Sequence, residues 1–433
     1  MPSTFNLKKF SFLVYGLGST GYSVIKYLKK KKVKNFYVWD DNKKLRGKFK
    51  YKKVKNLKKT LEKVNYIILS PGISLKKTKY KKYLTIFKKK IITDIDLLYL
   101  DNLNFKSIVV TGSNGKSTTC KIITHLLKKN KFNVKLGGNI GIPVLDLKVK
   151  SNTFFVIEAS SFQLSYSKFI RPDYAILLNI TNDHIDWHGS MNNYIQSKLK
   201  IFCLQNKNNF ALVNDKFKDI FKKKNFLSKL VFFKFKDYKK IKDKIKNFYL
   251  TSKANDENMN FVYALAKLLG ISEKSFVTSM STFSGLPHRY EIFLKKKGIT
   301  FINDSKATNF QATKFALISS KNIYWIIGGL PKKKDKIDLK FLKKNIIKSY
   351  IVGKKINFFK KQLQGQIKYE VTSNLKTSVL KILKDIKDTR INQSQKSIVL
   401  LSPSAASFDQ YKNFELRGNE FKKICKFYAK KLV

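Results

Sequence analysis

The chain of 433 residues is poor in several features, and each shortage excludes a class of protein. Its three cysteines, Cys120, Cys203 and Cys425, are odd in number and far apart, so neither a disulfide framework nor a CxxC metal site is expected. No run of 18 or more apolar residues is present, and the first residues lack the apolar core of a signal peptide. These absences predict a cytoplasmic protein without a membrane segment.

Acidic residues are also scarce, since 28 Asp and Glu stand against 90 Lys and Arg and give a formal net charge of +62 at pH 7. Such a charge raises nucleic-acid binding as one interpretation, because clustered cations release counterions from phosphate backbones. Only five basic residues are arginine, which is best suited to bidentate phosphate contacts, and the lysines are spread over the whole length. This distribution favours a bias toward A/T-rich codons. We expect no nucleic-acid partner, no membrane partner and a monomer.

A phosphate-binding loop is the most informative feature that is present. Residues 110–118 read Val-Thr-Gly-Ser-Asn-Gly-Lys-Ser-Thr, between a strand-like apolar run at 107–110 and a helical pattern at 119–127. Glycines let backbone N–H groups approach an anion, and a helix N-terminus adds the positive end of its dipole. Lys116 supplies a charge for the β- and γ-phosphates and Ser117 a hydroxyl for Mg²⁺. The loop is the shorter TGxNGKST type, because the first glycine of GxxxxGK[ST] is missing.

The start of the chain carries a second glycine motif. A strand predicted at 10–15 leads into GxGxxG at Gly16–Gly21, followed by a helix at 22–28 and a strand at 35–40 that ends on Asp40. This is the dinucleotide fingerprint, which read alone indicates NAD and an oxidoreductase. Any nucleotide diphosphate fits the same unit, so the motif leaves the ligand open.

Further strands end in polar residues throughout the chain. A strand at 66–69 precedes the turn Ser70-Pro71-Gly72, and the other apolar runs that predict strands are 154–158, 174–180, 300–304, 324–327 and 398–401. Strands alternating with helices predict an α/β fold with parallel sheets, whose ligands bind at the carboxyl edge. We divide the chain into domains at 1–99, 100–285 and 286–433. Residues 216–253 are lysine-rich and are expected to be solvated surface structure or a variable excursion.

Several polar residues follow these strands. Glu158 ends one strand where a Walker-B-like carboxylate is expected, and with Ser117 it could bind one Mg²⁺; the alternative is an acid at the start of the next helix. The spacing of the sequence alone does not identify His184 or Lys198 as a functional residue. The stretches 304–309 and 402–411 predict binding loops at a sheet edge, with ordinary turns as the alternative.

Taken in order, these motifs resemble those of the Mur ligase family over most of the chain. The similarity is carried by Thr111–Thr118, Gly137–Gly141, Glu158–Leu164, Asn182–His184, Lys198, Asn303–Asn309 and Leu401–Gly418. The last two stretches resemble the members that add D-glutamate. The resemblance implies three α/β domains: an N-terminal Rossmann-like UDP-binding domain, a central P-loop ATPase-like doubly wound sheet and a C-terminal Rossmann-like domain for the amino acid.

The resemblance also implies a reaction. It is the ATP-dependent ligation of D-glutamate to UDP-N-acetylmuramoyl-L-alanine through an acyl phosphate, in cytoplasmic peptidoglycan precursor synthesis, with two Mg²⁺ ions. Another amide ligase of the superfamily, such as a folylpolyglutamate synthase, is the alternative, and the UDP-type N-terminal segment speaks against it. Trp187 departs from the family pattern, which commonly has a cation there.

Site residues follow from the same resemblance. The UDP-sugar is expected on Ser19, Thr20, Asp40, Gly72 and Asn139. ATP is expected on Gly112, Ser113, Asn114, Gly115, Lys116, Ser117, Thr118, Asn255, Arg289 and Asp304. The expected Mg²⁺ ligands are Ser117, Glu158, His184 and a carbamylated Lys198. The expected catalytic residues are Lys116, His184 and Lys198. D-glutamate is expected on Lys306, Thr308, Lys332, Ser407, Phe408 and Phe414. Carbamylation requires an uncharged amine, so the site must favour that form of Lys198.

Overall fold

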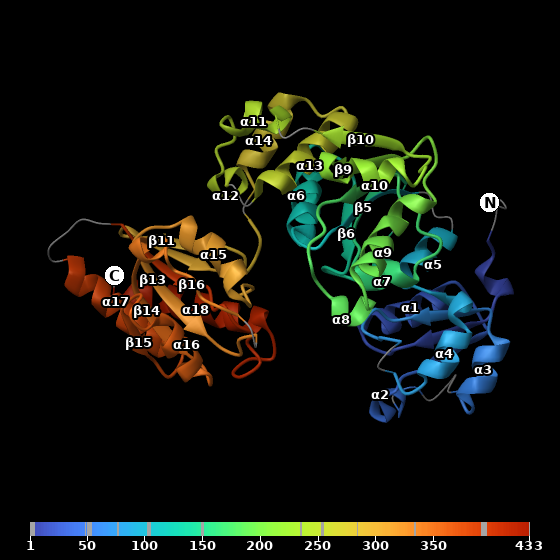
Figure 1. Ribbon diagram of the computed structural model, residues 1–433, viewed down its shortest axis with the longest axis horizontal. Coiled ribbons are helices and arrows are strands. Elements are labelled where there is room, and N and C mark those ends of the chain that lie inside the picture. The colour runs from blue at the N-terminus through green and yellow to red at the C-terminus, as the bar shows by residue number, and fades with distance from the viewer. Residues whose placement is uncertain are drawn as a thin grey trace. The chain divides into compact units, whose positions relative to one another are not determined.

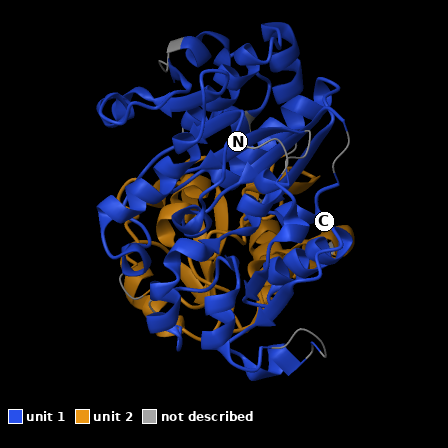
Figure 2. Ribbon diagram, turned by 90° about the vertical axis from the view of Figure 1, so that its right-hand side faces the viewer, with its two compact units in different colours: residues 1–283 blue, residues 284–433 orange. Residues whose placement is uncertain are grey.

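The computed structural model of the chain contains two compact units, Met1–Phe283 and Ser284–Val433, which Figure 2 shows in different colours. The residues it describes are 5–47, 49, 54–75, 78–101, 105–148, 151–233, 236–252, 255–283, 285–332, 335–390 and 396–432. Three separate sheets lie in these units, two in the first and one in the second. The α/β fold class is confirmed, and the limits 1–99, 100–285 and 286–433 stay a prediction.

The first unit begins with a four-stranded parallel sheet in the order β2–β1–β3–β4. Its strands are β1 (Phe12–Tyr15), β2 (Phe36–Trp39), β3 (Tyr66–Leu69) and β4 (Ile91–Ile92). Its helices are α1 (Ser19–Lys30), α2 (Lys43–Gly47), α3 (Leu57–Lys63), α4 (Lys81–Ile86) and α5 (Asp94–Leu100) (Figure 1). Every residue of β1 is buried, as expected for a central strand covered on both faces. The three strands and the helix predicted here are confirmed.

The second sheet of this unit has six parallel strands in the order β10–β9–β8–β5–β7–β6. They are β5 (Phe105–Thr111), β6 (Val134–Gly138), β7 (Thr153–Glu158), β8 (Tyr174–Leu177), β9 (Phe210–Asn214) and β10 (Lys229–Phe233). The chain extends the sheet first to one side of β5 and then to the other, so the predicted doubly wound topology is confirmed. The switch point lies beside β5, where ligands bind in such sheets.

Nine helices of the described residues accompany this sheet. They are α6 (Lys116–Lys129), α7 (Ser161–Tyr166), α8 (Ile185–His188), α9 (Met191–Cys203), α10 (Lys218–Lys222), α11 (Lys236–Lys242), α12 (Phe248–Thr251), α13 (Asp256–Leu268) and α14 (Glu273–Ser281). Two expectations need correction. The run at 174–180 is a strand only to Leu177. Residues 229–233 form the edge strand β10, where Leu230 and Phe232 pack on the core, a pattern that the surrounding lysines hide in the sequence.

The two sheets of the first unit share one buried hydrophobic cluster, which includes Val14 of β1 and Val109 of β5. A buried carboxylate also joins them. Asp96 on α5 accepts hydrogen bonds from Ser167 Oγ at 2.6 Å and from the backbone N–H groups of Lys168 and Phe169 at 2.9 and 2.8 Å. Because these partners directly follow α7, Asp96 sets the position of α7 against the first sheet.

The second unit contains a six-stranded sheet in the order β11–β12–β16–β13–β14–β15, in which only β11 runs antiparallel among the described strands. Its strands are β11 (Glu291–Lys296), β12 (Ile299–Asn303), β13 (Ile323–Gly328), β14 (Ile346–Val352), β15 (Tyr369–Val371) and β16 (Ser397–Leu401). Its helices are α15 (Phe310–Ile318), α16 (Ile356–Leu363), α17 (Leu375–Arg390) and α18 (Phe414–Leu432). The strands predicted at 300–304, 324–327 and 398–401 are confirmed to within one residue.

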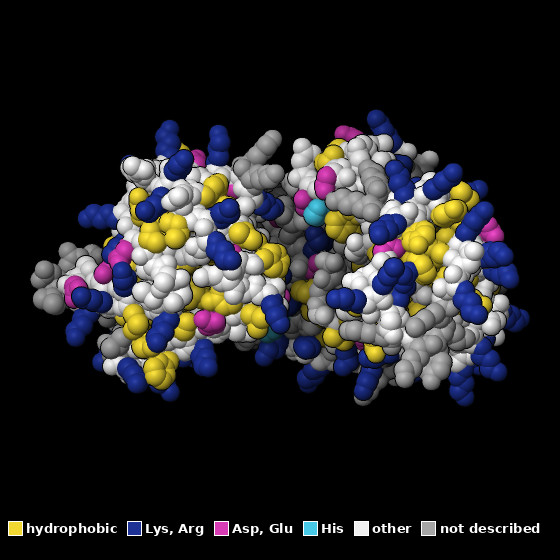
Figure 3. All heavy atoms as spheres, turned by 90° about the horizontal axis from the view of Figure 1, so that it is seen from below, with side chains coloured by type: hydrophobic (Ala, Val, Ile, Leu, Met, Phe, Trp, Pro, Cys, Tyr) yellow, Lys and Arg dark blue, Asp and Glu magenta, His cyan; other side chains and the backbone are white. Residues whose placement is uncertain are grey.

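Basic side chains are scattered over the face shown in Figure 3, among apolar and uncharged groups, and do not gather in one patch there. This distribution agrees with lysines placed at tolerant surface positions. Over the described ranges, none of the helices combines the length and the apolar character that crossing a bilayer requires.

Candidate functional site

The loop between β5 and α6 lies at the switch point of the central sheet. Asn179, which follows β8, holds it in place: its carbonyl accepts a hydrogen bond from Ser113 N at 2.9 Å, and its Oδ1 accepts one from Asn114 N at 2.8 Å. Helix α6 starts at Lys116. The first N–H groups of a helix have no intrahelical partner, so the loop and the helix start together offer donors to an anion.

Gly115 is required by the packing under this loop. It caps α6 with φ 83°, and a Cβ at this position would lie 2.3 Å from Oδ1 of Asn258 on α13. The same Oδ1 accepts a hydrogen bond from Thr119 Oγ1 at 3.1 Å, and Asn258 Nδ2 donates to Asn255 Oδ1 at 3.1 Å. Asn255, expected to contact ATP, is therefore linked to the loop through Asn258.

Two lysines converge on the carbonyl oxygen of Gly112. Lys116 Nζ donates to it at 2.8 Å and to Ser113 O at 2.9 Å. Lys198 on α9, only 1% exposed, donates to the same oxygen at 2.8 Å. Burial, and secondly the charge of Lys116, lowers the pKa of Lys198 to about 7. A substantial fraction of the Lys198 side chain is therefore an uncharged amine at neutral pH.

Helix α9 has a second link to the loop. The hydroxyl of Tyr194 lies 2.8 Å from Ser113 Oγ, and the Lys198 ammonium lies 4.5 Å from the centroid of the Tyr194 ring. Ser113 Oγ also accepts a hydrogen bond from Thr181 N at 2.9 Å. The position of α9 is thus coupled to the geometry of residues 112–113.

Glu158 is the last residue of β7 and is 2% exposed. Its Oε1 accepts a hydrogen bond from Asn139 Nδ2 at 2.9 Å, whereas its Oε2 is buried without a hydrogen-bond partner. Such an oxygen is costly unless a cation or a donor meets it. The alternative that Glu158 begins a helix is wrong, because the N-cap of α7 is Ser160, whose hydroxyl accepts a hydrogen bond from Gln163 N.

A divalent cation fits this edge of the sheet by the chemistry of its donors. Glu158 offers the unpartnered carboxylate oxygen, and Ser117 follows Lys116 at the start of α6. Mg²⁺ prefers such hard oxygen ligands together with phosphate oxygens and water. Over the described part of the chain, no group of three or more His, Cys, Asp or Glu side chains could hold a metal ion. A cation at this edge therefore depends on the Glu158 carboxylate and the Ser117 hydroxyl together with phosphate oxygens and water.

His184 is the N-cap of α8 and has φ 53°, which is uncommon for a residue with a side chain. Its ring centroid lies 4.7 Å from that of Phe162, and its Nε2 lies 3.4 Å from Oδ2 of Asp183. The side chain is 46% exposed, so it is open to a ligand. Its expected roles in catalysis and metal binding stay predictions.

The glycine loop of the first sheet is closely packed. A Cβ on Gly21 would lie 1.8 Å from the carbonyl oxygen of Gly16, so the third glycine of GxGxxG is needed for the approach of α1. Ser70 Oγ donates to that same oxygen at 2.9 Å. Ser19 and Thr20 open α1 directly after the loop. Gly72, in the turn that follows β3, is exposed.

Asp40 supports this loop from the end of β2. Its Oδ2 accepts a hydrogen bond from Leu17 N at 2.7 Å, and its Oδ1 accepts one from Asn42 N at 2.8 Å. The next acid, Asp41, accepts hydrogen bonds from Tyr15 Oη at 2.6 Å and Thr78 Oγ1 at 2.7 Å. Both carboxylates therefore stabilise the carboxyl edge of the sheet, and the expected contact of Asp40 with the UDP-sugar stays a prediction.

Three loops meet at the carboxyl edge of the sheet in the second unit, after β12, β13 and β16. Leu330 and Ala406 exchange backbone hydrogen bonds of 2.9 and 3.0 Å, which join the second and third loops. Arg417 on α18, 3% exposed, joins the first and third. Its Nη2 donates to Ser305 O at 2.8 Å and to Ala405 O at 3.0 Å, and its Nε donates to Ser305 Oγ at 3.0 Å. All three acceptors are neutral oxygens.

The residues expected to bind D-glutamate lie on these loops or beside them. Lys306 Nζ is 5.0 Å from the centroid of the Phe414 ring, and Ser305 Oγ donates to Phe414 O at 2.9 Å. Ser407 is buried, Thr308 is half-buried, and Lys332 is exposed. Phe408 is 71% exposed.

Asp304 and Arg289, expected to contact ATP, belong to the second unit. Asp304 is buried and accepts hydrogen bonds from Ser402 Oγ at 2.6 Å and from Tyr290 N at 3.1 Å. Burial raises the pKa of Asp304 to about 7, against the opposing effect of the Ser402 hydrogen bond. The Nε of Arg289 is buried without a hydrogen-bond partner.

Two family models match the chain. The Mur ligase middle domain covers residues 110–274, and the MurD-like N-terminal domain of Mur ligases covers residues 10–86. The chain is also 36% identical to the UDP-N-acetylmuramoylalanine–D-glutamate ligase of Rickettsia prowazekii (strain Madrid E), over 97% of this chain and 98% of that protein. The chain belongs to the Mur ligase family. The ligase of the same name from Caulobacter sp. (strain K31) is 32% identical over 82% of both chains.

Solved structures of Mur ligases have the same fold. MurF ligase from Thermotoga maritima in complex with ADP has a TM-score of 0.56 at 16% identity and covers 98% of both chains. UDP-N-acetylmuramate-alanine ligase MurC from the same organism has a TM-score of 0.54 at 14% identity, over 97% of this chain and 100% of that chain. These structures confirm the fold, and the family models and the curated relatives confirm the family that the motifs indicated.

Sequence reasoning missed several residues that build the site. Asn179 and Tyr194 hold the nucleotide loop, Asn258 packs beneath it, and Arg417 joins two loops of the second unit. Asn179 could have been predicted from the sequence, because it follows an apolar run that ends at the same sheet edge as the loop. Arg417 is one of only five arginines and lies within the motif stretch Leu401–Gly418, but no role could be predicted for it, because its contacts span more than 100 residues of sequence.

Proposed function

We propose that the protein is an ATP-dependent ligase that joins D-glutamate to UDP-N-acetylmuramoyl-L-alanine in the cytoplasm. The two relatives named above are both called UDP-N-acetylmuramoylalanine–D-glutamate ligase, and they match 97% and 82% of this chain. The structural observation that supports it best is the cluster at the central sheet edge. There the buried low-pKa amine of Lys198 contacts the donor-rich loop after β5, and the neighbouring strand β7 ends on Glu158 with its unpartnered oxygen.

In the proposed reaction, the alanyl carboxylate attacks the γ-phosphate of ATP and gives an acyl phosphate and ADP. The D-glutamate amine then attacks the acyl carbon, and phosphate leaves from the tetrahedral intermediate. Lys116 exchanges its hydrogen bonds to Gly112 O and Ser113 O for contacts with the phosphates. Catalysis is then mostly positioning and charge neutralisation, as in other phosphoryl transfers.

Ser117, Glu158, His184 and Lys198 would hold Mg²⁺, with two ions proposed in all, and the metal would neutralise charge on the phosphates when bound. Lys198 suits this role only after modification, because an ammonium cannot donate electrons to a cation. The low pKa of Lys198 supports carbamylation, since the neutral amine is the form that reacts with carbon dioxide.

The amino acid is proposed to bind on the loops of the second unit. Lys306, held near Phe414, supplies a cation for one carboxylate of D-glutamate, and Lys332 is proposed to meet the other. Thr308, Ser407, Phe408 and Phe414 complete the proposed contacts. A dicarboxylate matches two cations, which is the basis for preferring glutamate over a neutral amino acid.

The test is phosphate release from ATP with a panel of acceptors and amino acids. Turnover is expected only when UDP-N-acetylmuramoyl-L-alanine and D-glutamate are both present, and not with L-glutamate, D-alanine or L-alanine. A folate acceptor with L-glutamate is included for the alternative amide ligase. Enzyme that consumes no ATP with both proposed substrates, or that uses the folate acceptor instead, would refute the proposal.

A further inference from the structure

The chain contains four histidines, and one of them, His288, has no role in the reaction as described so far. It is 6% exposed and lies in the segment 285–291, which leads into β11. Its φ of 62° is uncommon for a residue with a side chain. A buried side chain on such a backbone is held in place by its contacts.

Three segments of the second unit meet at His288. Its N–H donates to Glu291 Oε2 at 2.9 Å, and its carbonyl oxygen accepts a hydrogen bond from Lys306 N at 3.0 Å. Its ring lies at 78° to the ring of Phe414, with the centroids 6.0 Å apart. His288 therefore contacts the loop after β12 and the start of α18, which carry Lys306 and Phe414, two residues expected to bind D-glutamate.

The side chain of Asn303, at the end of β12, turns its nitrogen toward His288. Asn303 Nδ2 donates to Glu291 Oε2 at 3.0 Å and to Gly418 O at 3.4 Å. Asn303 Oδ1 accepts a hydrogen bond from Ser305 N at 3.2 Å. The opposite orientation of the amide would place Oδ1 against a carboxylate and a carbonyl, which only accept. These contacts therefore determine the orientation of the amide.

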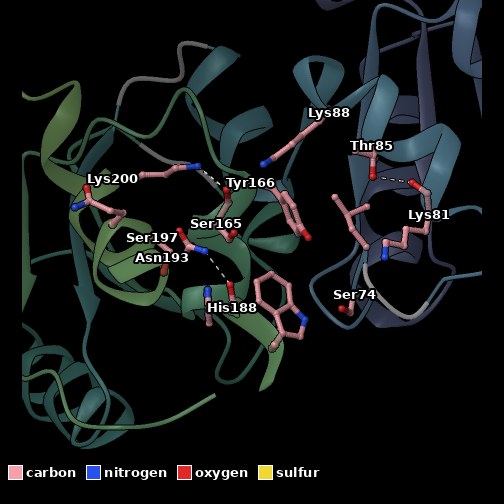
Figure 4. A pocket seen from close by; sticks show the side chains of 13 residues that line it. Ser74, Lys81, Thr85, Lys88, Ser165, Tyr166, His188, Asn193, Ser197 and Lys200 are labelled. Atoms are coloured by element: carbon pink, nitrogen blue, oxygen red, sulfur yellow. Dashed lines mark hydrogen bonds between the residues drawn. The ribbon is translucent and has the colours of Figure 1, made fainter. Parts of the chain in front are cut away.

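This orientation determines where the proton of the His288 ring lies. Its Nδ1 is 2.9 Å from Asn303 Nδ2, and an amide nitrogen can only donate. Nδ1 must therefore accept, so the ring is neutral and carries its proton on Nε2. His188, on the wall of the pocket in Figure 4, differs, because its Nε2 lies 3.0 Å from Ser161 Oγ, and this hydroxyl contact suits either tautomer.

Helix α18 approaches the His288–Asn303 pair at a glycine. A Cβ on Gly418 would lie 2.2 Å from His288 Nδ1 and 2.8 Å from Asn303 Oδ1. Glycine inside a helix is less stable than alanine, so its presence here fits a helix that must come this close to the pair. Gly418 lies about one turn after Phe414. The pair therefore supports the first turns of α18.

Charged groups face the imidazole from each of these segments: Glu291 from β11, Lys306 from the loop after β12, and Glu415 and Lys422 from α18. Burial lowers the pKa of His288; the two carboxylates oppose this shift, and the two lysines reinforce it. Protonation would place an N–H on Nδ1 against the N–H of Asn303. Asn303 would then have to turn and lose its hydrogen bonds to Glu291 and Gly418.

We propose that His288 is a positioning residue of the amino-acid site, which as a neutral imidazole accepts a hydrogen bond from Asn303 and holds the loop after β12 against the start of α18. Through this link it keeps Lys306 and Phe414 in place for D-glutamate. The link to D-glutamate rests on the proposed function, whereas the state of the imidazole does not. Protonation of His288 in acid breaks the link and weakens the binding of the amino acid.

The state of the imidazole is measured by ¹⁵N NMR of the full chain labelled at its four histidines. The signals of His288 are those that disappear in His288→Asn. At pH 7 they should show a neutral ring with its proton on Nε2. A charged imidazolium, or a proton on Nδ1, would overturn the proposal.

Two variants of His288 test the link to the amino acid by steady-state kinetics. His288→Asn keeps an acceptor, its Oδ1, at the place of Nδ1 and tolerates a positive φ, so the KM for D-glutamate should stay within about threefold of its original value. His288→Phe keeps a ring but has no acceptor, so this KM should rise by about tenfold or more. The KM for the UDP-sugar, whose expected site lies in the first unit, should change in neither variant.

An unchanged KM for D-glutamate in folded His288→Phe, or an equal rise in both variants, would contradict the positioning role; Tm values identify a variant that folds poorly. The pH profile tests the same role without His288→Phe. In the unaltered enzyme, kcat/KM for D-glutamate should fall over the pH range in which NMR shows His288 gaining a proton. His288→Asn should lack this part of the fall, and identical profiles would refute the link. Unaltered enzyme that never uses D-glutamate would instead refute the proposed function, and the NMR spectrum would still decide the state of His288.

Discussion

The nucleotide loop of the first unit and the three loops of the second unit are both proposed anion sites at a sheet edge, but they are built differently. The nucleotide loop is one continuous stretch, Gly112–Thr118, whose donors come from its own backbone and from the start of α6. The second site is assembled from loops after β12, β13 and β16, joined by the guanidinium of Arg417 and by the Leu330–Ala406 pair.

This difference decides how each site fails. A contiguous loop depends on single side chains that meet the ligand. Removing one such side chain should therefore reduce catalysis and have little effect on folding. An assembled site depends on a buried group that never meets the ligand. Removing that group leaves buried carbonyls unsatisfied and lets the loops move relative to each other. The four predictions below follow from this contrast.

The largest effect is expected at Lys116. Lys116→Ala removes the charge that neutralises the phosphates, so ATP-dependent ligation should fall by on the order of 10³-fold or more. Phosphate release measures the loss. The control Lys128→Ala, an exposed lysine of the same helix, should keep full activity. Retained turnover in Lys116→Ala, or an equal loss in the control, would contradict the role given to the loop.

Arg417→Lys should act on the assembled site. A lysine has one nitrogen in place of Nη2 and Nε, so it cannot make all three hydrogen bonds of Arg417, and kcat/KM for D-glutamate should fall by on the order of 10²-fold. Steady-state kinetics should show the loss in the KM for D-glutamate, with the KM for ATP nearly unchanged. Arg171→Lys, at an exposed arginine, serves as the control. A lower Tm with an unchanged KM for D-glutamate would show that Arg417 serves stability alone.

Lys198 should show a stability effect that depends on pH. Its pKa is about 7 in the folded protein and near 10.5 when unfolded, so the unfolded chain binds more protons between these values. The cost of burying Lys198 is therefore greatest below pH 7 and disappears as the pH rises toward 10.5.

Lys198→Met should thus raise stability by about 1–2 kcal/mol at pH 6, after the loss of the hydrogen bond to Gly112 O, and by less near pH 10. Calorimetric Tm values across this range measure it, with exposed Lys207→Met as the control. A gain that is the same at every pH would contradict the low pKa.

The smallest effect is expected at Tyr194. Tyr194→Phe removes the hydroxyl 2.8 Å from Ser113 Oγ and leaves the ring under Lys198, so activity should fall only a few-fold, equivalent to about 1 kcal/mol. The KM for ATP is the measurement. An effect as large as that of Lys116→Ala would show that α9, and not the loop itself, controls nucleotide binding.

The sequence by itself determined the parts whose chemistry lies in one short stretch. The GxGxxG unit, the TGxNGKST loop and the strands that lead into them could be predicted, because turn residues and apolar runs act over a few neighbours. The edge strand β10 could not, since its two core residues lie among lysines that conceal the alternation.

Only the tertiary structure decided which basic residues are special. Lys198 is one lysine among many until packing buries it beside Gly112 and lowers its pKa. Arg417 gains its place from Ser305, which is 112 positions away in the chain. Burial and hydrogen bonding of this kind depend on segments that meet only after folding, so no local pattern in the sequence contains them.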